Sequence, residues 1–86
     1  NQMIEEQALA MVGAAEGYLI EEGYGTIRVR YENTLARIEM PKNLALELLN
    51  DNRLSQICAQ LKALGFLHVT LDLEGYRYQN SAIKEV

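Results

Sequence analysis

The sequence contains few of the residues that build disulfide and metal sites. Cys58 is its single cysteine and His68 its single histidine among 86 residues. One cysteine excludes an internal disulfide framework and is typical of a reducing compartment, so we expect a cytoplasmic protein. A zinc site is also excluded, because such a site needs a cluster of cysteine and histidine ligands.

Long apolar runs are absent as well. No run approaches the roughly 20 residues of a membrane helix, and no basic and then apolar signal segment opens the chain, so we expect no membrane partner. The formal net charge of −4 disfavours nucleic acid, which binds basic surfaces. The hydrophobic content of 49% is that of a globular chain, which predicts one domain over residues 1–86. Because the chain begins with Asn1 and not methionine, we expect a piece of a longer protein.

The sequence also lacks the common catalytic motifs. It has no G-x-S-x-G nucleophile elbow, and its glycine-rich stretch, Gly23–Gly25, follows an expected helix where a phosphate loop would open one. Cys58 falls in the apolar stripe of an expected helix, which favours an inert buried thiol over a nucleophile. We therefore expect no catalysis by this chain alone.

Hydrophobic periodicity predicts an α-β-β-α-α-β order. The expected elements are a helix over 2–22, strands over 26–32 and 35–40, helices over 41–49 and 53–64, and a strand over 66–73. The segments LIEEGYGTIRV and LKALGFLHVTL repeat the same series of helix end, glycine, aromatic residue and strand. Two such units, each led by a strand, form a ferredoxin-like fold, but the first unit here has no leading strand.

The fold class expected is therefore α+β, a two-layer sandwich that is ferredoxin-like or truncated ferredoxin-like. Its element order is α-β-β-α-β if the two adjacent helices are counted as one. Without a leading strand, either the third strand pairs directly with the hairpin or a sheet edge stays unpaired. Unpaired edges recruit other strands, so we expect a homo-oligomer formed through an edge or through the charged face of the sheet.

Strand alternation predicts which side chains share each face of the sheet. Apolar side chains face the helices: Ile27, Val29, Tyr31, Ala36, Ile38, Met40, Leu67, Val69, Leu71 and Leu73. The other face, called the open face below, gathers Arg28, Arg30, Arg37, Glu39, His68, Thr70 and Asp72.

Three roles for the open face remain open on residue types alone. It is a solvated surface with cross-strand ion pairs, an anion site, or a surface that packs on a neighbouring domain. The anion site would use Arg28 and Arg30, whose guanidinium groups stand two residues apart on one strand and can fork around phosphate oxygens.

Several motifs resemble a known family. The stretch AAEGYLIEEGYGTIRVRYENTLARIEM, followed by LKALGFLHVTLDLEGYR, is similar to the C-terminal region of the ATP-dependent sacrificial sulfur transferases. These are PP-loop ATP-pyrophosphatase relatives that act in biosynthesis of the nickel-pincer cofactor of lactate racemase. The resemblance covers most of residues 14–77 and depends on separate motifs in order: A-E, R-V-R, L-A-R-I-E, L-K-x-L-G-F and L-D-L-x-G-Y-R.

The resemblance implies an accessory or oligomerisation domain of such an enzyme. Its partner would be an N-terminal PP-loop domain that binds ATP and Mg and acts on a small nucleotide-like substrate, and the present chain would bind no cofactor itself. The family motifs place phosphate-binding arginines at Arg28 and Arg30, and acidic metal-binding residues at Glu16 and Glu47. The PP-loop S-G-G-x-D-S and the sulfur-donating cysteine are not in this chain. The alternative is a non-catalytic interaction or dimerisation module with no ligand site.

Overall fold

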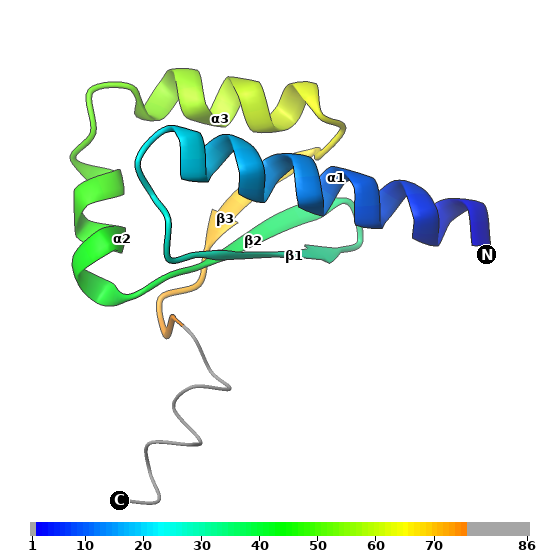
Figure 1. The fold of residues 1–86 in the computed structure, drawn as a ribbon, viewed down its shortest axis with the longest axis horizontal. Helices are drawn as coiled ribbons and strands as arrows, with labels where there is room; N and C mark the ends of the chain where they lie inside the picture. The colour runs from blue at the N-terminus through cyan, green and yellow to red at the C-terminus, as the bar shows by residue number, and fades with distance from the viewer. Residues whose placement is uncertain (1, 76–86) are drawn as a thin grey trace, which may run out of the picture.

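The computed structural model describes residues 2–75 and has the predicted order of elements. The elements are α1 (Gln2–Glu21), β1 (Arg28–Glu32), β2 (Leu35–Glu39), α2 (Lys42–Leu49), α3 (Leu54–Ala63) and β3 (His68–Leu71). Helices α1 and α3 lie side by side over one face of the sheet, and α2 lies at its end (Figure 1). The α+β fold class is confirmed, and it is compatible with a truncated ferredoxin-like arrangement. Between residues 2 and 75, no helix combines the length and apolarity that crossing a membrane requires.

The sheet has the order β1-β2-β3, with β2 in the centre. Strands β1 and β2 are antiparallel, whereas β2 and β3 are parallel. The third strand therefore pairs directly with a hairpin strand, which was one of the two outcomes expected without a leading strand. A parallel neighbour requires a crossover connection, which α2 and α3 provide here.

A two-residue turn sets the register of the hairpin. Asn33 and Thr34 both have positive φ, 51° and 68°, as in a type I′ turn. The flanking pair is Glu32 and Leu35, and the register continues to Arg28 opposite Glu39. Because side chains alternate along each strand, this register places Val29, Ile38 and their neighbours under the helices and the arginines on the opposite face.

One core fills the space between sheet and helices. Its buried side chains are Ala15, Leu19, Tyr24, Val29, Ala36, Ile38, Met40, Leu48, Ile57, Leu61 and Phe66. They come from every helix and from the hairpin, and Val69 and Leu71 of β3 pack against them. The core therefore fixes the position of all three strands relative to the helices.

The internal repeat is visible in the backbone. Gly23 and Gly65 follow α1 and α3 with φ of 107° and 122°, a region that residues with a side chain rarely adopt. The next residue in each case, Tyr24 or Phe66, is buried in the core. In each unit the chain thus changes direction at a glycine, and the aromatic ring that follows packs into the core.

Two leucines predicted to face the helices are exposed. Leu67 is 62% exposed and Leu73 is 92% exposed, so this part of the prediction was wrong. The reason is that β3 spans only His68–Leu71. Both leucines lie beyond the ends of β3, where strict alternation no longer determines the direction of a side chain.

Candidate functional site

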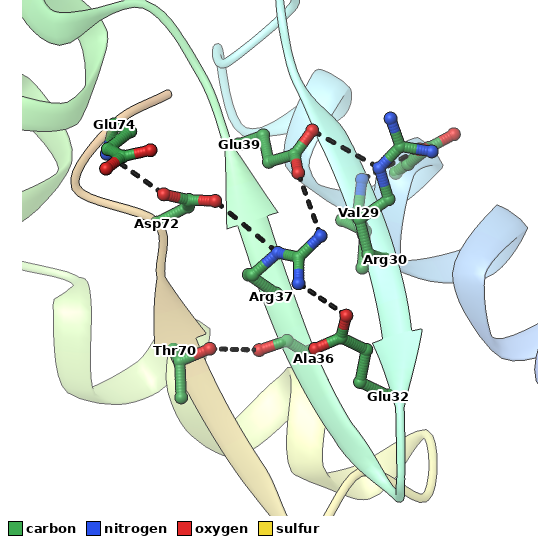
Figure 2. Close-up of polar contacts among 10 residues, drawn as sticks. Val29, Arg30, Glu32, Ala36, Arg37, Glu39, Thr70, Asp72 and Glu74 are labelled. Atoms are coloured by element: carbon green, nitrogen blue, oxygen red, sulfur yellow. Dashed lines mark hydrogen bonds and ion pairs between the residues drawn. The ribbon is translucent and has the colours of Figure 1, made fainter. Parts of the chain in front are cut away.

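The open face brings together the polar residues that strand alternation predicted. Arg30 on β1 lies directly opposite Arg37 on β2, and Arg37 lies opposite Thr70 on β3. Like charges opposite each other destabilise a strand pair unless anions neutralise them. Carboxylates at the two flanking positions do so here (Figure 2). The Thr70 hydroxyl instead donates a hydrogen bond to the carbonyl oxygen of Ala36 (2.8 Å), and His68 is exposed.

Arg37 is surrounded by three carboxylates. Its Nη1 donates a hydrogen bond to Glu32, its Nη2 lies 3.2 Å from Glu39 Oε2, and its Nε lies 3.5 Å from Asp72 Oδ2. The last distance suits an ion pair but lacks hydrogen-bond geometry. The hydrogen bond to Glu32 raises the pKa of Arg37 above its ordinary value, and the bond to Glu39 adds to this effect. Each guanidinium nitrogen of Arg37 thus has a carboxylate beside it.

Glu39 is buried even though it lies on the face opposite the helices. It is 2% exposed, and its two oxygens are shared between Arg37 Nη2 and Arg30 Nε, each at 3.2 Å. Burial of a carboxylate is costly unless cationic partners compensate for the lost water, and two arginines do so here. The sequence predicted that Glu39 shares this face but gave no sign that it is buried there.

Arg30 uses only part of its guanidinium group in this network. Within residues 2–75, its hydrogen bond and ion pair both involve Nε, and no partner contacts Nη1 or Nη2. Figure 2 shows Glu39 joined to Arg30 by a single dashed line, at Nε. Arg28 is exposed on the same strand, two residues before Arg30. The geometry therefore leaves a two-nitrogen edge of Arg30 beside the position of Arg28.

The two carboxylates suggested as metal ligands have different surroundings. Glu16, on α1, is half-buried and its Oε2 accepts a hydrogen bond from the backbone N–H of Val29 (2.8 Å). Glu47, on α2, is exposed. Among residues 2–75, no group of three or more His, Cys, Asp or Glu side chains is arranged to hold a metal ion. A metal site at Glu16 and Glu47 stays a prediction.

A second polar cluster, which the sequence did not reveal, joins the ends of α1 and α2. The Tyr24 hydroxyl donates to Asp51 Oδ2 (2.7 Å), and the Arg53 backbone N–H and Nε donate to Asp51 Oδ1 (2.8 and 3.0 Å). Arg53 also pairs with Glu22 at the end of α1. The hydrogen bond from Arg53 holds the pKa of Asp51 well below its ordinary value, whereas burial and the bond to Asp51 raise the pKa of Tyr24 to about 12. These contacts connect the segment after α1 to the loop between α2 and α3, which is a structural role.

The single cysteine lies among apolar side chains. Cys58 is half-buried on α3 and lines an apolar cavity of about 260 Å³ with Ile57, Leu61 and Val69. Cys58 is less buried than expected, and its lack of reactivity stays a prediction.

Comparison with known proteins supports the resemblance seen in the motifs. No family model matches the chain. It is 46% identical over 69 residues, 80% of its length, to the pyridinium-3,5-bisthiocarboxylic acid mononucleotide synthase of Lactiplantibacillus plantarum. It is also 45% identical over 77 residues, 90% of its length, to the uncharacterized protein slr1717 of Synechocystis. The chain spans only 24% and 29% of these relatives. Its resemblance to the sacrificial sulfur transferases is thus confirmed, as a similarity between most of this chain and about a quarter of the Lactiplantibacillus synthase.

Proposed function

We propose that the chain is the C-terminal accessory domain of an ATP-dependent sulfur transferase, in which Arg28 and Arg30 bind a phosphate group. The sequence similarity supports the enzyme class. The observation that carries the phosphate site is the Nη1–Nη2 edge of Arg30, which has no partner within residues 2–75. This edge has the fork geometry that matches two phosphate oxygens.

The contrast with Arg37 supports the choice of residues. All three arginines of β1 and β2 share the open face, but Arg37 has a carboxylate at each of its guanidinium nitrogens. An incoming anion would have to displace these carboxylates from Arg37, whereas it could add to Arg30 without breaking a bond. Arg30 is therefore better placed than Arg37 to bind an anion.

The remaining parts of the activity would come from the rest of the enzyme. A PP-loop domain of the same protein would bind ATP and Mg, and the phosphate held here would belong to a small nucleotide-like substrate in the cytoplasm. The name of the Lactiplantibacillus relative gives its product as a mononucleotide, a compound that carries a phosphate group. Glu16, which lies against β1 through its bond to Val29, would stand near this phosphate site.

Titration of the chain with inorganic phosphate, followed by NMR of the arginine side chains, tests the site. We expect the signals of Arg28 and Arg30 to shift in the millimolar range, which corresponds to about 4 kcal/mol of binding free energy. The double variant Arg28→Ala with Arg30→Ala should lose the shifts and remain folded, because Arg37 still pairs with the buried Glu39.

A matched control separates a specific site from net charge. The variant Lys42→Ala with Lys62→Ala also removes two positive charges, but from exposed positions on α2 and α3. It should bind phosphate as the unmodified chain does. Equal weakening in both double variants would show that phosphate responds only to overall charge. Absence of any shift in the unmodified chain would favour the alternative, an interaction module without a ligand site.

A further inference from the structure

We propose that Glu39 is a positioning residue, which orients Arg30 so that its two terminal nitrogens face the phosphate. This role rests on the proposed function of Arg30 as a phosphate ligand. Glu39 itself does not touch the anion in this proposal. Its contribution is to hold the Nε of Arg30 and thereby to direct the opposite edge of the guanidinium group outward.

The carboxylate of Glu39 is suited to this because it is itself held in place. Its Oε2 lies 3.2 Å from Arg37 Nη2, and Arg37 is in turn bound by Glu32 on β1 and by Asp72 after β3. The contacts thus run from Asp72 through Arg37 and Glu39 to Arg30, across all three strands (Figure 2). A carboxylate fixed at one oxygen and 2% exposed can orient a partner at its other oxygen.

Orientation matters because an arginine side chain loses rotamer freedom when it binds a ligand. Immobilising such a side chain during binding weakens affinity by roughly two- to tenfold compared with a side chain already fixed. In the structure, Arg30 is already tied to β2 by its Nε contact at 3.2 Å. The binding site is therefore preorganised before an anion arrives.

Simple electrostatics predicts the opposite result for the same variant. A carboxylate close to an anion site repels the anion, so its removal should strengthen binding if Glu39 acts only through its charge. The positioning role predicts weaker binding despite the lost negative charge. The sign of the change in affinity distinguishes the two explanations.

The experiment measures phosphate affinity of the 86-residue chain with Glu39→Gln, which keeps the shape of the side chain and removes its charge. We expect the dissociation constant to rise roughly two- to tenfold. Glu21→Gln is the control for a lost negative charge, because Glu21 is an exposed carboxylate at the end of α1 and lies outside the series of contacts that joins Asp72 to Arg30. It should leave the affinity unchanged or slightly higher.

A double-variant comparison shows whether Glu39 acts through Arg30. In the Arg30→Ala background, Glu39→Gln should have no further effect on phosphate affinity. A purely structural effect of Glu39→Gln would weaken binding equally in both backgrounds and would overturn the proposal. Equal or tighter binding by Glu39→Gln alone would overturn it as well.

A measurement on the unmodified chain avoids variants that fold poorly. The Arg30 Nε–H NMR signal should be that of an ordered, hydrogen-bonded group without phosphate, and it should remain that of a group bonded to Glu39 when phosphate is added. A signal that moves with phosphate to that of a group released from Glu39 would mean that the anion competes with Glu39, which contradicts positioning. If the unmodified chain binds no phosphate, the proposed function fails and the positioning role fails with it. If it binds phosphate but Glu39→Gln does not weaken binding, only the positioning role fails.

Discussion

The two glycines of the internal repeat offer a matched test of how the helices pack. Gly23 and Gly65 have similar positive φ values, 107° and 122°. A Cβ atom built at Gly23 meets nothing within 4 Å, whereas one at Gly65 lies 3.0 Å from Cε and 3.2 Å from Sδ of Met11 on α1. Gly23→Ala therefore adds backbone strain alone, and Gly65→Ala adds the same strain together with crowding against α1.

The expected costs follow from these distances. A residue with a side chain in such a backbone conformation costs about 1–3 kcal/mol. The smaller entropy of the unfolded alanine chain offsets about 0.4–1 kcal/mol of this. We expect Gly23→Ala to destabilise the fold by about 1–2 kcal/mol. Crowding in a packed interior adds about 1–3 kcal/mol, and the flexible thioether of Met11 places Gly65→Ala near the lower limit of this addition.

Thermal unfolding followed by circular dichroism measures the difference. Gly65→Ala should lower Tm by about 4–8 °C more than Gly23→Ala does, which is the shift expected for 1 kcal/mol in a domain of this size. In a Met11→Ala background the two substitutions should become equal, because the crowding atoms are gone. Equal effects in the unmodified background would show that α1 does not approach Gly65 as described. A difference that persists without Met11 would refute crowding as its cause.

The other predictions concern charged groups. Because the pKa of Tyr24 is raised from 10.0 to about 12, the contribution of its hydroxyl group to stability should be complete below pH 10 and lost as the pH rises through 12. Urea unfolding at pH 8 to 11 should show the start of this decline, and Tyr24→Phe should make the decline smaller. The lowered pKa of Asp51 predicts a loss of stability as the pH falls below about 4, which Asp51→Asn should lessen. Arg37→Met should lower the free energy of unfolding by about 3 kcal/mol, because it leaves the buried Glu39 with Arg30 alone. Glu32→Gln, at an exposed carboxylate, should lower it by less than about 1 kcal/mol. Similar values for the two variants would contradict the buried network.

The sequence predicted the elements and the two faces of the sheet because both follow from local periodicity. Strand alternation has a period of two, so Arg28, Arg30 and Arg37 had to share a face once the hairpin register was set. The glycines that end α1 and α3 were equally readable, since a positive φ favours glycine over any other residue. These features depend on residues close together in the chain.

The partners within the site could not be predicted in this way. Whether Glu39 binds Arg28, directly opposite, or Arg30, on the diagonal, depends on side-chain conformations and not on spacing. The contact between Arg37 and Asp72 requires β3 to lie beside β2, and the sequence left that pairing open. The burial of Glu39 follows from both contacts together. Nonlocal arrangement therefore decided that Arg37 is surrounded by carboxylates, whereas Arg30 bonds to Glu39 through its Nε.

The concentration of arginine on one face of an acidic chain has a physical explanation in this network. Arg30 and Arg37 lie directly opposite each other, which would be unfavourable without carboxylates nearby. Neutralising both arginines fully would leave no group for an anion, and neutralising neither would strain the sheet. Within residues 2–75, Arg37 instead has a carboxylate beside each guanidinium nitrogen, and Arg30 is bound only through its Nε. Affinity for phosphate would then depend on the orientation of a single guanidinium edge beside Arg28 and not on a positive net charge, which is compatible with the formal charge of −4.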